Sequence, residues 1–509
     1  MILPIKLPQC FLAAQPRGGF VVEAAQTKLQ EKTMGPRVCP LAFLPVLPLE
    51  WQFNGGSGSM RIVQIIPGTG GTFYCQNCLR DLELVRALQR QGHEVLVVPL
   101  YLPIALNDAS AKSKPAFYSA VVLYLRHVCP RLARLLPAAC WRIFESMPVL
   151  RLAARLAGST RAAGLGDITV SMLQGEKGRQ AEELERLVTW LRNDLAARPD
   201  VVVLSNALLL GLARRIKAEL HVPIVCWLQD EHVWSDAMSP AEAAHVGQVL
   251  RERAADVDGL VAVSRTYASR MTAALGLAPE RVRVIHIGVE SSPPPPAGLS
   301  RTPRTVGFLS RLASGEGFGL FVEAFIELHR DARFADVRMK ATGGMTDPAY
   351  VSRQRQRLRR AGLGDLAIID PDAFRNQRSA FLQSLTLLSS PVPDGEAFGT
   401  YVIEAMAAGV PVVEPAAGAY PEIFQEAGCG VLCAAADAQA LAAAWAALLD
   451  DPSRLADEAR RGRDAVQRHF NLERMARETV AYYEELRIQG SGERVDNAGG
   501  PGAPRTGRK

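Results

Sequence analysis

Two glutamates eight positions apart, Glu396 and Glu404, flank a glycine turn and an alanine-rich helical pattern. Gly399 and Thr400 stand where that pattern begins, after Phe398, so the N–H groups of the first helical turn would be free to bind phosphate. Carboxylates accept the hydrogen bonds that sugar hydroxyls donate, so Glu404 in the helix suits a ribose and Glu396 on the loop suits a hexose. The run therefore predicts a sugar-nucleotide site. The alternative is an ordinary amphipathic helix that begins with solvated acids.

The run from Glu396 to Val413 resembles the Glu-seven-Glu motif of the retaining glycosyltransferases of family 4, which belong to glycosyltransferase group 1. Gly418-Ala-Tyr-Pro-Glu422-Ile and Gly428-Cys-Gly430-Val-Leu follow in the order found in that family. The resemblance implies the α/β fold called GT-B, with two facing Rossmann-like domains and parallel sheets. It also implies that the second domain holds a nucleotide-diphosphate sugar, that the first holds the acceptor, and that transfer of a hexose retains the anomeric configuration without a metal or cofactor.

Composition limits the classes of protein to which the chain can belong. With 509 residues and 48% apolar content, it can bury two ordinary domain cores. A net charge of +6 suits anionic small molecules or an acidic membrane surface, and it is too weak and too dispersed to predict nucleic-acid binding. Nine scattered cysteines indicate a reducing compartment, for which the cytoplasm is the default. No run approaches the roughly 20 consecutive apolar residues of a spanning helix.

Periodicity and punctuation suggest five segments. Residues 1–59 lack sustained periodicity and end in Gly55-Gly-Ser-Gly-Ser59, so they are expected to be a disordered extension or linker, with Met60 as the natural start. The prolines of Ser291-Ser-Pro-Pro-Pro-Pro296 mark a linker between domains. The resemblance implies that the remaining segments are a first Rossmann-like acceptor domain at 60–290, a nucleotide-sugar domain at 297–470 and a crossing helix at 471–487. The glycine, proline and charged residues at 488–509 predict a disordered tail.

The first domain contains an interruption at about 104–166, which is predicted to be a helical insertion. From Lys112 to Arg161 it carries nine Lys or Arg residues against one acid, Glu145, with apolar clusters between them. This pattern is compatible with basic amphipathic helices that contact an anionic membrane surface, or receive an anionic acceptor, through residues 112–161. It is equally compatible with helices that pack on the domain and expose their arginine face to solvent.

A glycine-containing loop follows the first predicted strand, Met60 to Ile66, and leads into a helix and a second strand. This is a βαβ unit. The loop resembles the one that lies at the domain cleft of the family, beside donor phosphate and acceptor, so Gly70 and Gly71 are candidates because glycine permits close backbone approach. A dinucleotide-dependent oxidoreductase is disfavoured, because the loop is not a complete GxGxxG followed by a suitably placed acid.

The predicted strand Val222 to Leu228 ends in Gln229, Asp230, Glu231 and His232, where ligands of parallel sheets collect. Many members of the resembling family carry a histidine at the position of Gln229, and it contacts the transferred sugar. Asp230, Glu231 or His232 could substitute for it, with His232 on the acceptor side of the cleft. A solvated loop with titratable residues and no function is the alternative.

The second domain opens with a strand that delivers Arg311, whose guanidinium is expected to bind the donor diphosphate. Five residues later the family usually places a lysine, and this chain has Glu316. A carboxylate there would oppose the charge that develops on the leaving group unless Lys340 or Arg375 compensates. Gly343 ends another strand at the same predicted edge. The changes at Glu316 and Gln229 leave open a second interpretation, a catalytically weak or inactive sugar-nucleotide-binding partner subunit.

Overall fold

The computed structural model describes residues 58–68, 76–101, 166–195, 197–290, 303–344, 346–371, 373, 377–434 and 436–498. Six of the sequence expectations concern residues outside these ranges, wholly or in part. They are the loop glycines Gly70 and Gly71, the helical insertion up to residue 165 with its candidate membrane contact at 112–161, the extension up to residue 57, the proline linker at 291–296, Arg375, and the tail beyond residue 498.

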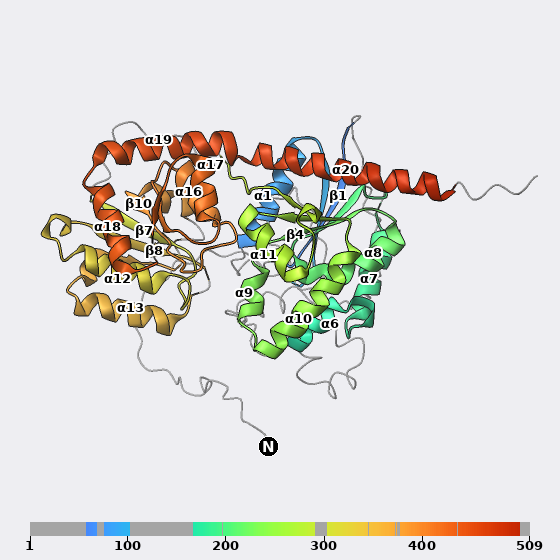
Figure 1. Cartoon of the computed structure of the whole chain (residues 1–509), viewed down its shortest axis with the longest axis horizontal. Coiled ribbons are helices and arrows are strands. Elements are labelled where there is room, and N and C mark those ends of the chain that lie inside the picture. The colour runs from blue at the N-terminus through green and yellow to red at the C-terminus, as the bar shows by residue number, and fades with distance from the viewer. Residues whose placement is uncertain are drawn as a thin grey trace, which may run out of the picture. The chain divides into compact units, whose positions relative to one another are not determined.

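The first domain is built on a six-stranded sheet with the strand order β2-β1-β3-β4-β5-β6, in which neighbouring strands run parallel (Figure 1). Long runs of valine, isoleucine and leucine suit strands that are buried on both faces. The order reverses between β1 and β3, and ligands of open α/β sheets bind in the crevice at such a point. The strands are β1 (Arg61–Ile66), β2 (Glu94–Pro99), β3 (Val201–Leu204), β4 (Ile224–Leu228), β5 (Gly259–Ala262) and β6 (Val282–Val284).

Among the described residues of the first domain, seven α-helices accompany this sheet, and local sequence fixes where several of them begin. In α10, Ser239 accepts a hydrogen bond from the Glu242 amide while the Glu242 carboxylate accepts one from the Ser239 amide, which is a capping box. The helices are α1 (Gln76–Arg90), α6 (Gly166–Leu173), α7 (Ala181–Asn193), α8 (Ala213–Leu220), α9 (Glu231–Asp236), α10 (Pro240–Arg253) and α11 (Arg265–Leu275).

The second domain contains a parallel sheet of order β10-β7-β8-β9 and a parallel pair, β11 and β12. A bridge between Leu388 and Val412 leads from one to the other. The strands are β7 (Thr305–Leu309), β8 (Arg338–Thr342), β9 (Ala367–Ile369), β10 (Leu387–Leu388), β11 (Val413–Pro415) and β12 (Val431–Cys433). The helices are α12 (Phe318–Leu328), α13 (Pro348–Arg360), α15 (Arg378–Gln383), α16 (Thr400–Ala407), α17 (Tyr420–Ala427), α18 (Ala438–Leu449) and α19 (Pro452–His469).

The last helix, α20 (Leu472–Ala498), follows the second domain in sequence and packs on the first (Figure 1). Trp227 Nε1 in β4 donates a hydrogen bond of 3.1 Å to the hydroxyl of Tyr483 in α20. A Cβ atom at Gly259 in β5 would lie 2.6 Å from the Leu486 side chain, so the helix approaches the sheet closely. The helix continues to Ala498, beyond the crossing helix predicted at 471–487, and its first part closes the first domain's core.

Two hydrophobic cores hold these elements. One fills the first domain and continues through α16 and α17 to Phe470 and α20. The other lies in the second domain around Phe308, Phe321 and Trp445, with the Phe321 and Trp445 rings 5.1 Å apart. Within the part of the chain that the structure describes, no helix is long and apolar enough to cross a membrane.

Candidate functional site

Helix α16 begins at Thr400, where the sequence predicted a phosphate-binding helix start. The residue before it, Gly399, has a φ angle of +78°, which glycine adopts without the steric cost that a side chain would impose. Gly399 supplies no capping side chain to the first-turn amides, and its backbone lies against the Tyr420 ring. The turn thus presents backbone N–H groups at the positive end of a helix, an arrangement that suits an anion.

The backbone of Glu396 is fixed by two neighbouring glycines. Gly395 and Gly418 have φ angles of +72° and +52°, and a Cβ atom at Gly418 would lie 2.6 Å from the Glu396 nitrogen. The Ala419 amide donates a hydrogen bond of 3.1 Å to the Glu396 carbonyl. The loop before α16 and the loop before α17 therefore support one another, and Gly418 of the family-like Gly418-to-Glu422 stretch has a structural reason to be glycine.

The Glu396 side chain lies among charged groups from both domains. Burial raises its pKa to about 8, and the negative charges of Asp230 and Glu316 add to that rise, while Arg311 opposes it. At neutral pH most of this carboxyl is therefore protonated in the ligand-free protein, so it can donate one hydrogen bond as well as accept others. The sequence predicted a carboxylate that only accepts. The difference arises from burial and from the charge of Asp230, which follows β4 of the other domain, and spacing along the chain reveals neither.

Arg311 forms an ion pair with Glu316, with 3.0 Å between Nη2 and Oε2. Both side chains are largely buried, and burial raises the pKa of Glu316 although Arg311 lowers it. Burial opposes the charge of Arg311, yet the carboxyls of Glu316, Glu396 and Asp230 raise its pKa above the ordinary value. A diphosphate that binds Arg311 must thus compete with Glu316. Lys340, one of the expected compensating cations, donates from Nζ to Ser384 Oγ at 3.0 Å.

The residues predicted to act at the end of β4 lie in different environments. Gln229 is buried, with 3% of its surface exposed, and its Nε2 donates to the Ser205 carbonyl at 2.6 Å. Asp230 is one of two described non-glycine residues with a positive φ, at 57°, a strained conformation of the kind found at functional sites. Asp230 lies near Glu396 and Arg311, whose pKa values its charge raises. The structure therefore brings Asp230 close to Arg311 and Glu396, and His232 also lies within reach of the Arg311 charge.

The acidic residue Glu231 and the aromatic residue Tyr267 fix the surroundings of His232. Glu231 is buried and accepts hydrogen bonds from the amides of Ala207 and Gln229 and from the hydroxyl of Tyr267. His232 Nδ1 lies 3.3 Å from that same hydroxyl, and burial lowers its pKa. Glu231 thus ties β4 to α11 and to the segment after β3, and it was not distinguished from its neighbours in the sequence.

Two of the predicted donor-binding residues, Gly343 and Phe398, are placed by close packing. Gly343 lies so close to the Ser310 carbonyl that any Cβ atom would collide with it, so its small size allows β7 and β8 to end side by side. The Phe398 ring is buried against His286 and Phe470, with ring centroids 5.9 and 6.1 Å away. Only the backbone of these residues is available to a ligand.

Glu404 points toward a cation that the sequence did not identify as its partner. Arg378 Nε, on α15, donates to Glu404 Oε2 at 2.9 Å, and both side chains are about one fifth exposed. Burial, followed by the charge of Glu404, raises the pKa of Glu83 on α1 to about 7. Glu404 thus lies between an arginine of its own domain and an acid of the first domain.

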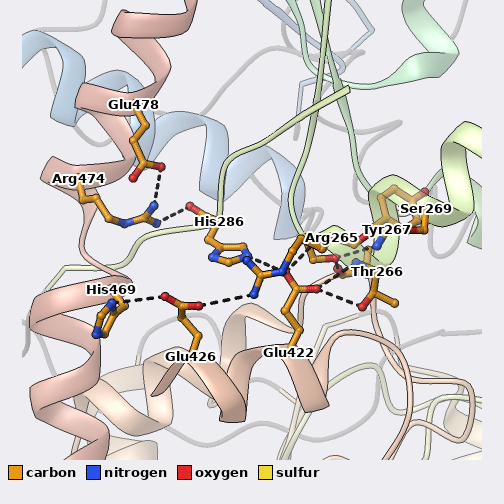
Figure 2. A network of polar contacts seen from close by, with 12 residues as sticks. Arg265, Thr266, Tyr267, Ser269, His286, Glu422, Glu426, His469, Arg474 and Glu478 are labelled. Atoms are coloured by element: carbon orange, nitrogen blue, oxygen red, sulfur yellow. Dashed lines mark hydrogen bonds and ion pairs between the residues drawn. The ribbon is translucent and has the colours of Figure 1, made fainter. Parts of the chain in front are cut away.

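A further carboxylate, Glu422 on α17, joins the two domains (Figure 2). It accepts hydrogen bonds from the first two amides of α11, those of Arg265 at 2.8 Å and Thr266 at 3.0 Å, and from the Thr266 hydroxyl at 3.1 Å. His286 Nε2 lies 2.7 Å from Oε1, the oxygen that also accepts the hydrogen bond from the Arg265 amide. Burial alone would raise the pKa of Glu422, but these hydrogen bonds lower it to about 2. The carboxylate therefore caps a helix of the other domain.

Comparison with known proteins agrees with this architecture. Residues 168–292 match the family profile described as Glycosyltransferase Family 4, and residues 303–451 match the profile of Glycosyl transferases group 1. The lipopolysaccharide core biosynthesis mannosyltransferase LpsB of Rhizobium meliloti is 34% identical over 199 residues, which cover 37% of this chain and 54% of that protein. A D-inositol 3-phosphate glycosyltransferase of Xylanimonas cellulosilytica is 24% identical over 89% of this chain and 97% of its own length. The chain spans 54% of the length of LpsB, and 60% and 56% of the lengths of two further curated relatives that it matches.

Solved structures show the same fold at low sequence identity. The Anabaena protein HepE, solved with UDP and glucose, superposes with a TM-score of 0.56 at 15% identity, covering 84% of this chain and 99% of HepE. The sucrose-phosphate synthase of Thermosynechococcus elongatus superposes with a TM-score of 0.60 at 16% identity, with the same coverage. Two parallel-sheet domains, the matched profiles and these neighbours lead to one conclusion: the chain has the GT-B fold and belongs to the group 1 glycosyltransferases of family 4.

Proposed function

We propose that this protein transfers a hexose from a nucleotide-diphosphate sugar to a glycan, lipid or small-molecule acceptor with retention of the anomeric configuration. The observation that carries the proposal is the meeting of Arg311 and Glu396 from the second domain with Asp230 from the first, next to the start of α16. An arginine and a helix start suit a diphosphate, and a carboxyl beside them suits the sugar.

Each group then has a defined task. The α16 amides and Arg311 stabilise the diphosphate as the bond from its oxygen to the sugar C1 breaks, and Glu404 accepts hydrogen bonds from the ribose. Glu396 orients the hexose. The acceptor oxygen forms its bond to C1 on the same face, and its proton passes to the departing phosphate oxygen. We also propose that the reaction needs no resident metal or cofactor, because the residues named here supply all these interactions.

The names of related proteins suggest which substrates to test first. HepE was solved with UDP, with UDP and glucose, and with UDP-glucose, and LpsB is named as a mannosyltransferase of lipopolysaccharide core biosynthesis. We accordingly propose a role in cell-envelope or glycan biosynthesis, with a cytoplasmic location that includes the inner face of the membrane. The candidate membrane contact at 112–161 remains a prediction from sequence.

The second candidate function, a catalytically weak or inactive sugar-nucleotide-binding subunit, is favoured by two contacts. Glu316 occupies Arg311 in the ligand-free protein, and Gln229 turns its amide toward Ser205. Neither contact prevents the helix start and Glu404 from binding a nucleotide. The two functions therefore differ in turnover and share donor binding.

The test is a panel of UDP-, GDP- and ADP-sugars, measured by thermal shift and by transfer to sugar, inositol and lipid acceptors. A ligand that binds only the native state raises the melting temperature. We expect at least one nucleotide sugar to do so and to be turned over, with the product's anomeric configuration, read by NMR, matching that of the donor. Binding without turnover would support the partner-subunit function, and an inverted product would contradict retention. Absence of binding by every nucleotide would contradict the whole site assignment.

A further inference from the structure

Behind Glu396 lies a group of polar side chains that no step above uses, and we call it the buried cluster. It consists of Tyr401 on α16, Glu414 on β11, Tyr420 on α17 and Ser390 before the Glu396 loop. All four are buried, and Ser390 and Glu414 have no exposed surface. Polar groups in such a position are costly unless hydrogen bonds satisfy them, so their contacts indicate what they do.

Glu414 fixes the backbone of Ser390. Its Oε1 accepts a hydrogen bond of 2.8 Å from the Ser390 amide, and its Oε2 has no hydrogen-bond partner among the described residues. Burial raises the pKa of Glu414 well above its ordinary value, and the charge of Glu396 raises it further. The raised pKa favours the neutral form of this carboxyl, and its hydrogen bond to the Ser390 amide fixes its position.

The two tyrosines share one carbonyl. Their hydroxyls are hydrogen-bonded to each other, and they lie 3.3 Å (Tyr401) and 3.4 Å (Tyr420) from the Ser390 carbonyl oxygen. A phenol donates one proton only, so the pair has two protons for the Ser390 carbonyl, the partner hydroxyl and Glu396. Of the two tyrosines, Tyr401 is the one whose hydroxyl lowers the pKa of Glu396, so it lies near enough to donate to that carboxylate. The proton of Tyr401 can therefore turn from Ser390 to Glu396 when Glu396 ionises.

We propose that Tyr401, Tyr420 and Glu414 are positioning residues, which hold the Glu396 carboxyl from behind and set its proton occupancy for contact with the donor hexose. The proposal rests on the proposed function, since it refines the role of Glu396 in the same site. It extends the site from the loop into the interior of the second domain, through Ser390.

Other charged groups also face Glu396 and enter the test. They come from the β4–α9 connection, from the segment after β7 and from β11: Asp230, Arg311, Glu316 and Glu414. Burial, Asp230 and Glu316 raise the pKa of Glu396, while Arg311 and the Tyr401 hydroxyl lower it. Removal of the Tyr401 hydroxyl alone must therefore raise it further, because the ionised form loses a donor.

The first arm measures Glu396 in the free protein by infrared titration of its carboxyl band, assigned as the band that Glu396→Gln abolishes. Tyr401→Phe should move the midpoint upward by about half a pH unit or more. Tyr483→Phe is the matched control, since it removes a buried tyrosine hydroxyl bonded to Trp227 and away from this site. An unmoved midpoint in Tyr401→Phe would overturn the proposal, and this arm needs no substrate.

The second arm compares the affinity of each variant for UDP, which lacks the hexose, and for UDP-glucose. Tyr401→Phe and Tyr420→Phe should each weaken the affinity for UDP-glucose about tenfold, while the affinity for UDP changes less than about twofold. The same pattern is expected of Glu396→Gln. Glu414→Gln should keep wild-type selectivity because it preserves the neutral acceptor, whereas Glu414→Ala should lose it. An equal loss of affinity for both ligands, with a melting-temperature change like that of Tyr483→Phe, would show that the cluster only supports the fold and would overturn the proposal. A wild-type protein that binds neither ligand would exclude a UDP-sugar as the donor, and the infrared arm would still decide on the cluster.

Discussion

At the scale of single residues, the charge balance around Arg311 controls how strongly the site can hold a diphosphate. Arg311 is the cation, while Asp230, Glu316 and Glu396 are acids that share its surroundings. Protonation of Glu396 removes part of the negative charge, and the Arg311–Glu316 ion pair neutralises another part. Nucleotide binding should therefore respond to the substitution of single acids.

Glu316→Lys is expected to strengthen UDP binding about tenfold, equivalent to about 1.4 kcal/mol. The change frees Arg311 and adds a cation where a lysine is usual in the family. Isothermal titration calorimetry with UDP measures it. Glu323→Lys is the matched control, because Glu323 lies in the same domain and pairs with Arg357. Equal strengthening in both variants would show a general effect of net charge, contrary to the prediction.

Glu404→Ala is expected to weaken UDP binding about tenfold, because the ribose loses an acceptor and Arg378 loses its partner. Glu404→Gln separates the two contributions, since the amide keeps an acceptor for the ribose and removes the ion pair. UDP affinity that is unchanged in the alanine variant would contradict the ribose role. These measurements use thermal shift or calorimetry and need no acceptor.

At the scale of elements, Glu422 shows how a side chain from one domain completes a helix of the other. Its carboxylate binds the first amides of α11, whose own cap, Ser264, donates from Oγ to the Ala397 carbonyl of the Glu396 loop at 2.7 Å. The start of α11 and the Glu396 loop are thereby held together. A change at Glu422 should thus affect stability first and the site second.

Glu422→Gln is expected to lower the melting temperature at neutral pH, and the deficit should shrink as the pH falls. The pKa of Glu422 is about 2 in the folded protein, below its ordinary value near 4.5. A depressed pKa stabilises the fold above the unfolded-state value, and this stabilisation is lost as the pH falls from about 4.5 toward about 2. Melting curves between about pH 6 and about pH 3 measure the deficit. Glu426→Gln is the control, and a deficit for Glu422→Gln that does not change with pH would contradict the prediction.

At the scale of the whole molecule, α20 matters because it follows the second domain and packs on the sheet of the first. Leu486 lies against Gly259 and is 9% exposed, whereas Ile488, on the same helix, is 68% exposed. This pair of residues lets the packing of the helix be tested with one kind of substitution.

Leu486→Asp is expected to destabilise the protein by about 3 kcal/mol or more, because it removes buried apolar surface and buries a charge. Ile488→Asp should leave stability within about 0.5 kcal/mol. Urea unfolding of both variants measures the difference. Equal effects would show that α20 does not contribute to the core of the first domain.

The sequence by itself determined the α/β alternation, the parallel strands and the start of α16, because these depend on local hydrophobic pattern and on glycine. β3, for example, spans Val201–Leu204, as the run of apolar residues predicts. The apolar pattern over 208–220 predicts a single helix, whereas the structure has a 3₁₀ helix, Ala207–Leu212, followed by α8, because local pattern does not distinguish the two kinds of helix well. The motif from Glu396 to Val413 was likewise readable, since its groups lie within two turns of one helix and its loop.

Only the tertiary structure decided which groups surround that motif. Asp230 raises the pKa of Glu396 from 166 positions away in sequence, and Glu422 caps α11 from 157 positions away. In the sequence, Glu414 is one acid that follows an apolar run. Its burial beside Ser390, Tyr401 and Tyr420 depends on how β11, α16 and α17 pack together. Charge and burial depend on distance in space, so a chain read residue by residue identifies candidate groups while the fold sets their protonation and their partners.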